Sequence, residues 1–197
     1  AALNREAEAF LKSINFPFTV GYGMTECGPL ISYAPWEENR FSSVVRPINY
    51  LQLKIDSLDP AQTVGEIMVK GENIMEGYYK DEGASREVLG RDGWLRTGDL
   101  GVLDEKGFLY IRGRRKNLIL GPSGQNIYPE EIESKLNIMP LVQGSLILED
   151  KGSLVALVYP DWEAVDTLKN GEQEEEKWLA KKMEEMRKAV NKQLPAY

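Results

Sequence analysis

Residues 94–120, WLRTGDLGVLDEKGFLYIRGRRKNLIL, contain the change of pattern that decides the fold. Before this stretch, from about residue 51, short alternating apolar runs are separated by turn dipeptides, which predicts a small antiparallel sheet or barrel-like subdomain. After it, a glycine-rich loop leads into helix and strand signals in a different order. We therefore predict two parts, residues 1–113 and residues 114–197, with the boundary inside this stretch.

Residues 114–197 read as a small α+β unit of βαββ-like order. Pro129 is expected to open a helix that ends near Leu136, with acidic residues in its first turn, where the helix dipole favours them. Two apolar runs on either side of residues 149–152 predict a hairpin. From Trp178 onward, apolar residues at three- to five-residue steps predict an amphipathic helix. A solvated surface helix is the favoured interpretation of that pattern, and contact with a membrane surface is the alternative.

A glycine-rich loop, GYGMTE at residues 21–26, follows a predicted helix at residues 1–12 and a predicted strand at residues 16–20. A tyrosine between glycines can lie against a flat base. The threonine hydroxyl and glutamate carboxylate that follow are hard oxygen ligands, suited to Mg²⁺ or phosphate chemistry. On residue types alone, a plain turn is the commoner outcome.

A second candidate site is the stretch WLRTGDLG at residues 94–101. A carboxylate such as Asp99, on a tight glycine turn, can accept two hydrogen bonds from the neighbouring hydroxyls of a ribose. The alternative is a capped turn in which Asp99 bonds only backbone amides.

A third candidate is basic, GRRKNLIL at residues 113–120, and it continues into the helix signal at residues 124–133. Two arginines beside a lysine present donors that could hold a phosphate or a ribose. A solvated basic turn is the competing interpretation.

Composition excludes several classes of function. The net charge of -7 argues against nucleic-acid binding, which depends on cationic side chains. Without any histidine, the chain cannot build a Ser–His–Asp triad, a Cys–His dyad or a histidine zinc site. The single cysteine, Cys27, fits a reducing cytoplasm. No apolar run approaches the roughly 20 residues of a membrane span, so we expect a cytoplasmic protein, with peripheral membrane association left open.

Taken in this order, the three motifs resemble those of the adenylate-forming superfamily, which includes acyl-CoA synthetases, adenylation domains and luciferases. The resemblance runs from Ala1 to Tyr197, and residues 27–33 and 191–195 look most like bacterial long-chain fatty acid–CoA ligases. It implies that residues 1–113 are the end of a large AMP-binding domain with the barrel-like subdomain. Residues 114–197 would be a mobile carboxy-terminal α+β domain, truncated before its end.

The resemblance also implies roles for individual residues. Thr25 and Glu26 would be catalytic, with Thr25 on phosphate and Glu26 as the metal ligand. Lys116 would be the hinge between the two domains, and Gly124 would let the backbone approach the pantetheine arm of CoA. Some family members have a lysine where Leu120 stands, so a role for that lysine is not transferred. The nucleotide-binding residues would be Gly21, Tyr22 (on adenine), Gly23, Met24, Thr25, and, on ribose, Asp99 and Arg114.

The implied reaction joins a fatty acid to CoA at the expense of ATP, through an acyl-adenylate, with Mg²⁺ as the metal. An acyl-carrier-protein ligase or adenylation domain is the alternative within the same class. A non-catalytic nucleotide-binding or regulatory module is the alternative of another class. Two lysines that the family uses are expected upstream of Ala1 and beyond Tyr197, so the fragment alone is expected to be inactive.

Overall fold

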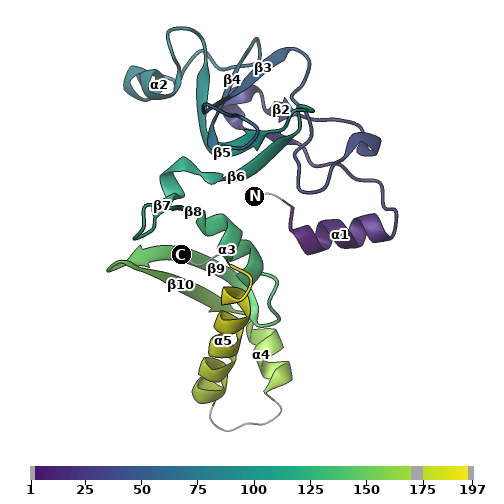
Figure 1. Cartoon of the computed structure of the whole chain (residues 1–197), viewed down its shortest axis with the longest axis vertical. Helices are drawn as coiled ribbons and strands as arrows, with labels where there is room; N and C mark the ends of the chain where they lie inside the picture. The colour runs from purple at the N-terminus through teal and green to yellow at the C-terminus, as the bar shows by residue number, and fades with distance from the viewer. Residues whose placement is uncertain (1–2, 170–174, 195–197) are drawn as a thin grey trace. The chain divides into compact units, whose positions relative to one another are not determined.

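The computed structural model describes residues 3–169 and 175–194, and the chain divides into two compact units, Ala1–Lys116 and Asn117–Tyr197 (Figure 1). Both units combine helices with antiparallel strands, which confirms the predicted α+β class. None of the helices in the described ranges combines the length and apolar content that crossing a bilayer needs.

The first unit is built on a four-stranded antiparallel sheet (Figure 1). Its strands follow one another in space as they do in the chain. The second strand carries buried side chains at successive positions, so both of its faces are covered. The strands are β3 (Leu51–Asp56), β4 (Gly65–Gly71), β5 (Leu95–Leu103) and β6 (Leu109–Arg114).

Apolar residues from the sheet and from the preceding loops form the core of this unit. The loops contribute through a short pair of strands, β1 (Tyr22–Gly23) and β2 (Leu30–Ser32), so the GYGMTE loop is packed against the sheet. Two short 3-10 turns, η1 (Thr25–Cys27) and η2 (Trp36–Glu38), flank β2. The buried members of the core are Tyr22, Cys27, Ile31, Val44, Leu51, Ile55, Ile67, Val69, Leu95 and Leu109.

Two helices complete the first unit, α1 (Arg5–Ser13) and α2 (Glu82–Val88). The first confirms the predicted amino-terminal helix, and the Asn4 side chain caps it by accepting from two backbone N–H groups. The predicted strand at residues 16–20 is wrong, because that segment pairs with no strand among the described residues. Pro17 within it has no N–H to donate to a ladder.

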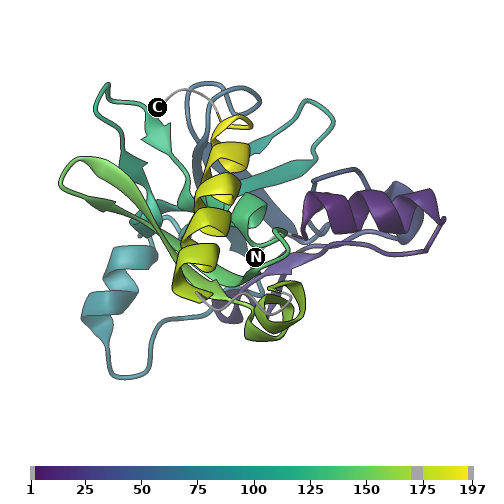
Figure 2. The same cartoon turned by 90° about the horizontal axis from the view of Figure 1, so that it is seen from below.

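The second unit has a hairpin of β9 (Val142–Asp150) and β10 (Ser153–Pro160), as predicted. The predicted helix at Pro129 is α3 (Pro129–Leu136), which packs against β9 and α5 (Glu175–Asn191) (Figure 2). Val190 of α5 is buried in the apolar core that α3, β9 and α5 share. Most charged residues of α5 are exposed, which confirms the predicted amphipathic helix. The remaining elements are β7 (Ile119–Leu120), β8 (Asn126–Ile127) and α4 (Trp162–Leu168), with the 3-10 turn η3 (Arg115–Asn117) at the junction.

Candidate functional site

Three residues that are far apart in the sequence converge in the first unit. The Tyr22 hydroxyl donates a hydrogen bond to Asp99 Oδ2 at 2.6 Å, and Arg114 Nε lies 2.9 Å from Asp99 Oδ1. Asp99 is only 6% exposed, whereas half of the Arg114 side chain faces solvent. Hydrogen bonds to an ionised group are shorter and stronger than neutral ones. The structure therefore joins a carboxylate, a phenol and a guanidinium that come from three separate motifs.

Strand pairing explains how Asp99 and Arg114 meet. The two residues are direct partners in the antiparallel pair β5–β6, so their side chains lie on the same face of the sheet. The Thr97 hydroxyl donates to the carbonyl oxygen of Ile67 at 2.9 Å and accepts from the Asp99 N–H at 3.1 Å. Gly98 between them has a φ of +73°, which glycine adopts without steric cost. In the Thr-Gly-Asp sequence, Thr97 therefore holds the turn by hydrogen bonds, Gly98 supplies its positive φ, and Asp99 presents the carboxylate.

Tyr22 is a buried hydrogen-bond donor. Burial, reinforced by the neighbouring Asp99 charge, raises the pKa of Tyr22 far above its ordinary value. The phenol stays protonated throughout the ordinary pH range and keeps donating to Asp99. Because the hydroxyl is engaged, the orientation of the ring is defined, while its stacking on adenine stays a prediction.

Glu26 lies in the turn η1 and contacts a residue that is distant in the sequence. The Tyr78 hydroxyl donates to Glu26 Oε1 at 2.8 Å, and this bond is the main cause of a raised pKa of Tyr78. Glu26 is half-buried, whereas Thr25 beside it is exposed. The turn therefore offers one oriented carboxylate and one accessible hydroxyl.

These donors suit a hard cation. Mg²⁺ in nucleotide sites is usually held by one or two carboxylates together with phosphates and waters. Within residues 3–169 and 175–194, no group of three or more His, Cys, Asp or Glu side chains could hold a metal by itself. One oriented carboxylate beside an accessible hydroxyl is a donor set that fits a nucleotide-bound Mg²⁺.

Glu66 is a residue of this region that sequence reasoning missed. Its carboxylate is buried, with Oε2 at 2.8 Å from Arg96 Nη1 and 3.0 Å from Arg115 Nη1. Its Oε1 accepts from the backbone N–H of Gly98 at 3.2 Å. Glu66 thus connects the Thr-Gly-Asp turn to the segment before the proposed hinge. A signal was present, because Glu66 directly precedes the apolar run at residues 67–69, and a buried charge in such a strand needs a partner.

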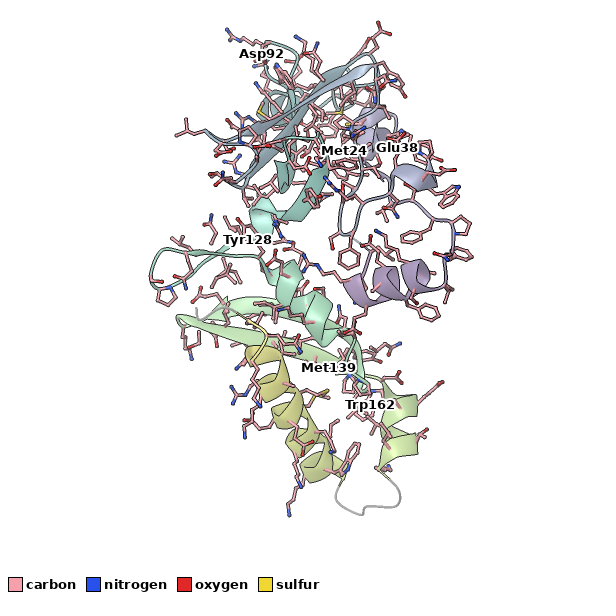
Figure 3. All side chains as sticks on the ribbon, turned by 45° about the vertical axis from the view of Figure 1, so that its right-hand side comes forward. Met24, Glu38, Asp92, Tyr128, Met139 and Trp162 are labelled. Atoms are coloured by element: carbon pink, nitrogen blue, oxygen red, sulfur yellow. The ribbon has the colours of Figure 1, made fainter. Side chains whose placement is uncertain are left out.

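The remaining predicted residues are distributed over both units. Gly21 is exposed just before β1, and the Met24 N–H donates to the carbonyl oxygen of Pro29 at 2.8 Å (Met24 is labelled in Figure 3). Lys116 lies in the turn η3 and is the last residue of the first unit. Gly124 belongs to the second unit, in the turn between β7 and β8, where its φ is +80°. The structure therefore brings the loop, Asp99 and Arg114 together, and it places Gly124 in the other unit.

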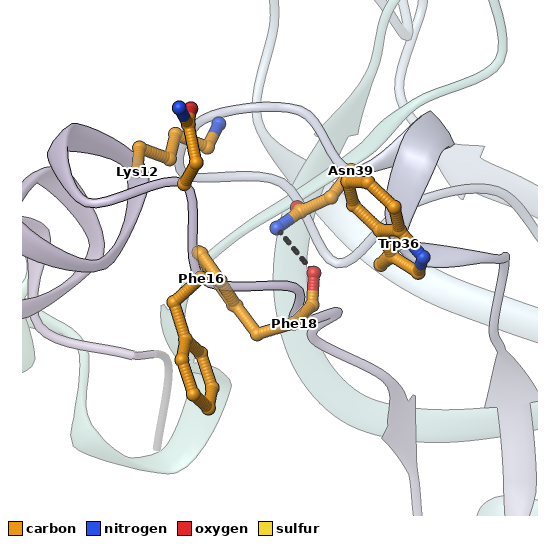
Figure 4. A pocket seen from close by; sticks show the side chains of 6 residues that line it. Lys12, Phe16, Phe18, Trp36 and Asn39 are labelled. Carbon is orange, nitrogen blue, oxygen red and sulfur yellow. Dashed lines mark hydrogen bonds between the residues drawn. The ribbon is translucent and has the colours of Figure 1, made fainter.

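A cavity of about 250 Å³ lies elsewhere in the first unit. Asn39 Nδ2 donates to the carbonyl oxygen of Phe18 at 3.1 Å on its wall (Figure 4). None of the residues predicted to bind nucleotide lines it, so the cavity does not enlarge the candidate site. Its lining residues are Lys12, Asn15, Phe16, Phe18, Trp36 and Asn39.

Gly23 is the position in the loop where a side chain would collide with the backbone. A Cβ atom there would meet the carbonyl oxygen of Pro29, across the β1–β2 pair. We expect Gly23→Ala to lower the free energy of unfolding by about 2–3 kcal/mol, measured by denaturant unfolding of the full-length protein. As a control, a Cβ at Gly144 meets nothing within 4 Å. Gly144→Ala should change the stability by less than about 0.5 kcal/mol, and equal losses in both variants would contradict the steric explanation.

Known proteins resemble this chain in sequence and in structure. The family described as AMP-binding enzyme matches residues 1–79. The 2-succinylbenzoate–CoA ligase of Bacillus cereus (strain Q1) is 40% identical over 166 residues, which cover 80% of this chain and 33% of that protein. A long-chain-fatty-acid–CoA ligase of Escherichia coli O6:H1 is 40% identical over 142 residues, which cover 70% of this chain and 25% of that protein.

A solved structure of a related enzyme has a similar fold. The O-succinylbenzoate coenzyme A synthetase (MenE) of Bacillus subtilis, in complex with ATP and magnesium ion, matches with a TM-score of 0.69 and 37% identity. The match covers 81% of this chain and 34% of that one, so the chain spans about a third of the length of such relatives. With the loop at residues 21–26, Asp99 and Arg114 assembled in one unit, these matches show that the chain belongs to the AMP-binding enzyme superfamily.

Proposed function

We propose that the full-length protein containing this chain is an ATP-dependent ligase that joins a carboxylic acid to CoA through an acyl-adenylate. The observation that supports this most strongly is the convergence of Tyr22 and Arg114 on the buried Asp99. The same loop that supplies Tyr22 carries Thr25 and Glu26, whose oxygens suit phosphate and Mg²⁺. A nucleotide needs both kinds of contact, one for its ribose and one for its phosphates.

In this proposal Asp99 binds the ribose. A carboxylate has about four lone-pair sites, and Tyr22 and Arg114 each use one, on different oxygens. Sites therefore remain for the two ribose hydroxyls. Arg114 is half exposed, and a guanidinium of this kind suits contacts to a phosphate or a ribose. The backbone of Gly21, Gly23 and Met24 would line the adenine and phosphate side.

The first half-reaction is attack of the acid's carboxylate oxygen on the α-phosphorus of ATP, with pyrophosphate as the leaving group. Such a reaction depends on positioning and on neutralising charge. The Thr25 hydroxyl would donate to a phosphate oxygen, and Glu26 would hold the metal. When bound, Mg²⁺ would neutralise negative charge on the phosphate oxygens.

The second half-reaction is attack of the CoA thiol on the acyl carbon, with AMP as the leaving group. Rotation about Lys116 would exchange the groups that serve the two half-reactions, a hinge motion of a common kind. Gly124 would allow the pantetheine arm to approach the backbone. Both roles rest on the resemblance of residues 113–133 to the family.

For the acid, we propose a long-chain fatty acid, because residues 27–33 resemble fatty acid–CoA ligases and a fatty acid ligase is among the relatives. A second candidate is 2-succinylbenzoate. It is supported by the Bacillus cereus relative, which is equally identical over a larger share of this chain.

Acid-dependent ATP–pyrophosphate exchange by the full-length protein tests the proposal. We expect exchange to require Mg²⁺ and to rise with a fatty acid, whereas a rise only with 2-succinylbenzoate would favour the second candidate. Adding CoA or a pantetheine-bearing carrier protein then identifies the acceptor. No exchange with any acid, together with tight ATP binding, would replace the ligase by a non-catalytic nucleotide-binding module.

A further inference from the structure

A segment that follows β4 supports the backbone of the Glu26 turn. Asn73 Nδ2 donates to the carbonyl oxygens of Cys27 at 2.6 Å and Leu30 at 2.9 Å. The Met75 N–H donates to the carbonyl oxygen of Glu26 at 2.8 Å. Three carbonyl groups in and after the turn are therefore bound by one short segment, which restricts the conformations open to the turn.

Tyr78, in the same segment, holds the carboxylate itself. Its hydroxyl donates to Glu26 Oε1 at 2.8 Å, and its own backbone N–H donates to Ser85 Oγ, also at 2.8 Å. Ser85 lies in α2 and donates onward to the carbonyl oxygen of Asp81 at 2.6 Å. The donor that reaches Glu26 is thus anchored at its backbone. In the part of the chain that the structure describes, Oε2 of Glu26 accepts no hydrogen bond.

We propose that Tyr78 is a positioning residue for Glu26, which fixes Oε1 so that Oε2 is presented to the divalent cation that accompanies ATP. This inference rests on the proposed function, in which Glu26 is the metal ligand. A ligand carboxylate that is already oriented loses less rotational freedom when the cation binds. Hydrogen-bond partners of metal ligands act in this way, and their loss typically weakens metal affinity by about 10–100-fold.

The test compares Tyr78→Phe with Tyr79→Phe in the full-length protein. Each change removes one hydroxyl, but Tyr79 is 88% exposed and lies one residue beyond the contact. Mn²⁺, used in place of Mg²⁺, is titrated with a non-hydrolysable ATP analogue present, and its binding is followed by electron paramagnetic resonance. We expect Tyr78→Phe to raise the Kd for Mn²⁺ about 10-fold and Tyr79→Phe to leave it unchanged.

Kinetics give a second measurement. In ATP–pyrophosphate exchange, Tyr78→Phe should raise the half-saturating Mg²⁺ concentration about 10-fold. The rate at saturating Mg²⁺ should stay within about two-fold of the wild type, because binding is weakened equally in the ground and transition states. If the hydrogen bond were merely structural, Tyr78→Phe would lower the unfolding temperature without raising the half-saturating Mg²⁺ concentration.

Glu26→Gln, measured alongside, separates this inference from the proposed function. If Glu26→Gln weakens Mn²⁺ binding while Tyr78→Phe leaves it at the wild-type value, the positioning role is overturned and the proposed function stands. If neither variant changes Mn²⁺ binding, Glu26 is not the ligand, and both ideas fail. Equal weakening in Tyr78→Phe and Tyr79→Phe would also overturn the positioning role.

Discussion

Replacing Asp99 by alanine is expected to slow acid-dependent ATP–pyrophosphate exchange of the full-length protein by about 10²–10³-fold. The carboxylate is almost fully buried, where it accepts a hydrogen bond from the Tyr22 hydroxyl and forms an ion pair with Arg114. Its loss would leave a buried phenol without its acceptor and remove the ion pair with Arg114, in addition to removing the proposed ribose ligand. The exchange rate as a function of ATP concentration measures the effect.

Two more variants test whether the lower exchange rate of Asp99→Ala comes from the lost charge at this position. Asp99→Asn keeps the shape and one acceptor oxygen but removes the charge that pairs with Arg114, so we expect an intermediate effect. Asp92→Asn is the matched control (Asp92 is labelled in Figure 3), because Asp92 is exposed and its side chain accepts from the Trp94 N–H at 3.4 Å. Unchanged exchange in Asp99→Ala would remove the ribose assignment.

Replacing Glu26 by glutamine is expected to lower the exchange rate by about 10²-fold or more. Glutamine preserves the size of the side chain and can still accept from Tyr78. It lacks the negative charge that a Mg²⁺ ligand supplies, so the loss reports the metal and not the packing of the turn. A Mg²⁺ titration of the exchange reaction measures both the maximum rate and the metal requirement.

Glu76→Gln is the control for this prediction. Glu76 is exposed and lies in the segment that carries Tyr78, so the change removes the same charge near the same turn. We expect its exchange rate and Mg²⁺ requirement to match the wild type. Similar losses in Glu76→Gln and Glu26→Gln would point to a general effect of net charge and would contradict metal ligation by Glu26.

Elements with strong local signals were predictable. The helix α3 begins at Pro129, and the β9–β10 hairpin covers both predicted apolar runs. A proline that opens a helix and a run of apolar residues are both properties of neighbouring positions. The helices α2 and α4 were not anticipated, since each has only seven residues and little room for a period. The segment 16–20 has the composition of a strand, but a strand also needs a partner.

The candidate site was predictable only as separate pieces. Asp99 and the loop at residues 21–26 can be found from residue types on glycine turns, and the family resemblance supplies their proposed roles. Glu66 and Tyr78 were missed because neither lies in a run with an obvious chemical purpose. Their importance comes from the atoms that they contact, which lie in other segments of the chain.

The sequence by itself determined the superfamily, the α+β class and the order of the nucleotide-facing motifs, because each of these depends on residues that are adjacent in the chain. Only the tertiary structure decided that Tyr22 donates to Asp99, that Glu66 pairs with Arg115 and that Tyr78 holds Glu26. These contacts join residues 77, 49 and 52 positions apart. Whether such residues meet depends on strand register and on the summed packing of the core, and neither is a property of any local stretch.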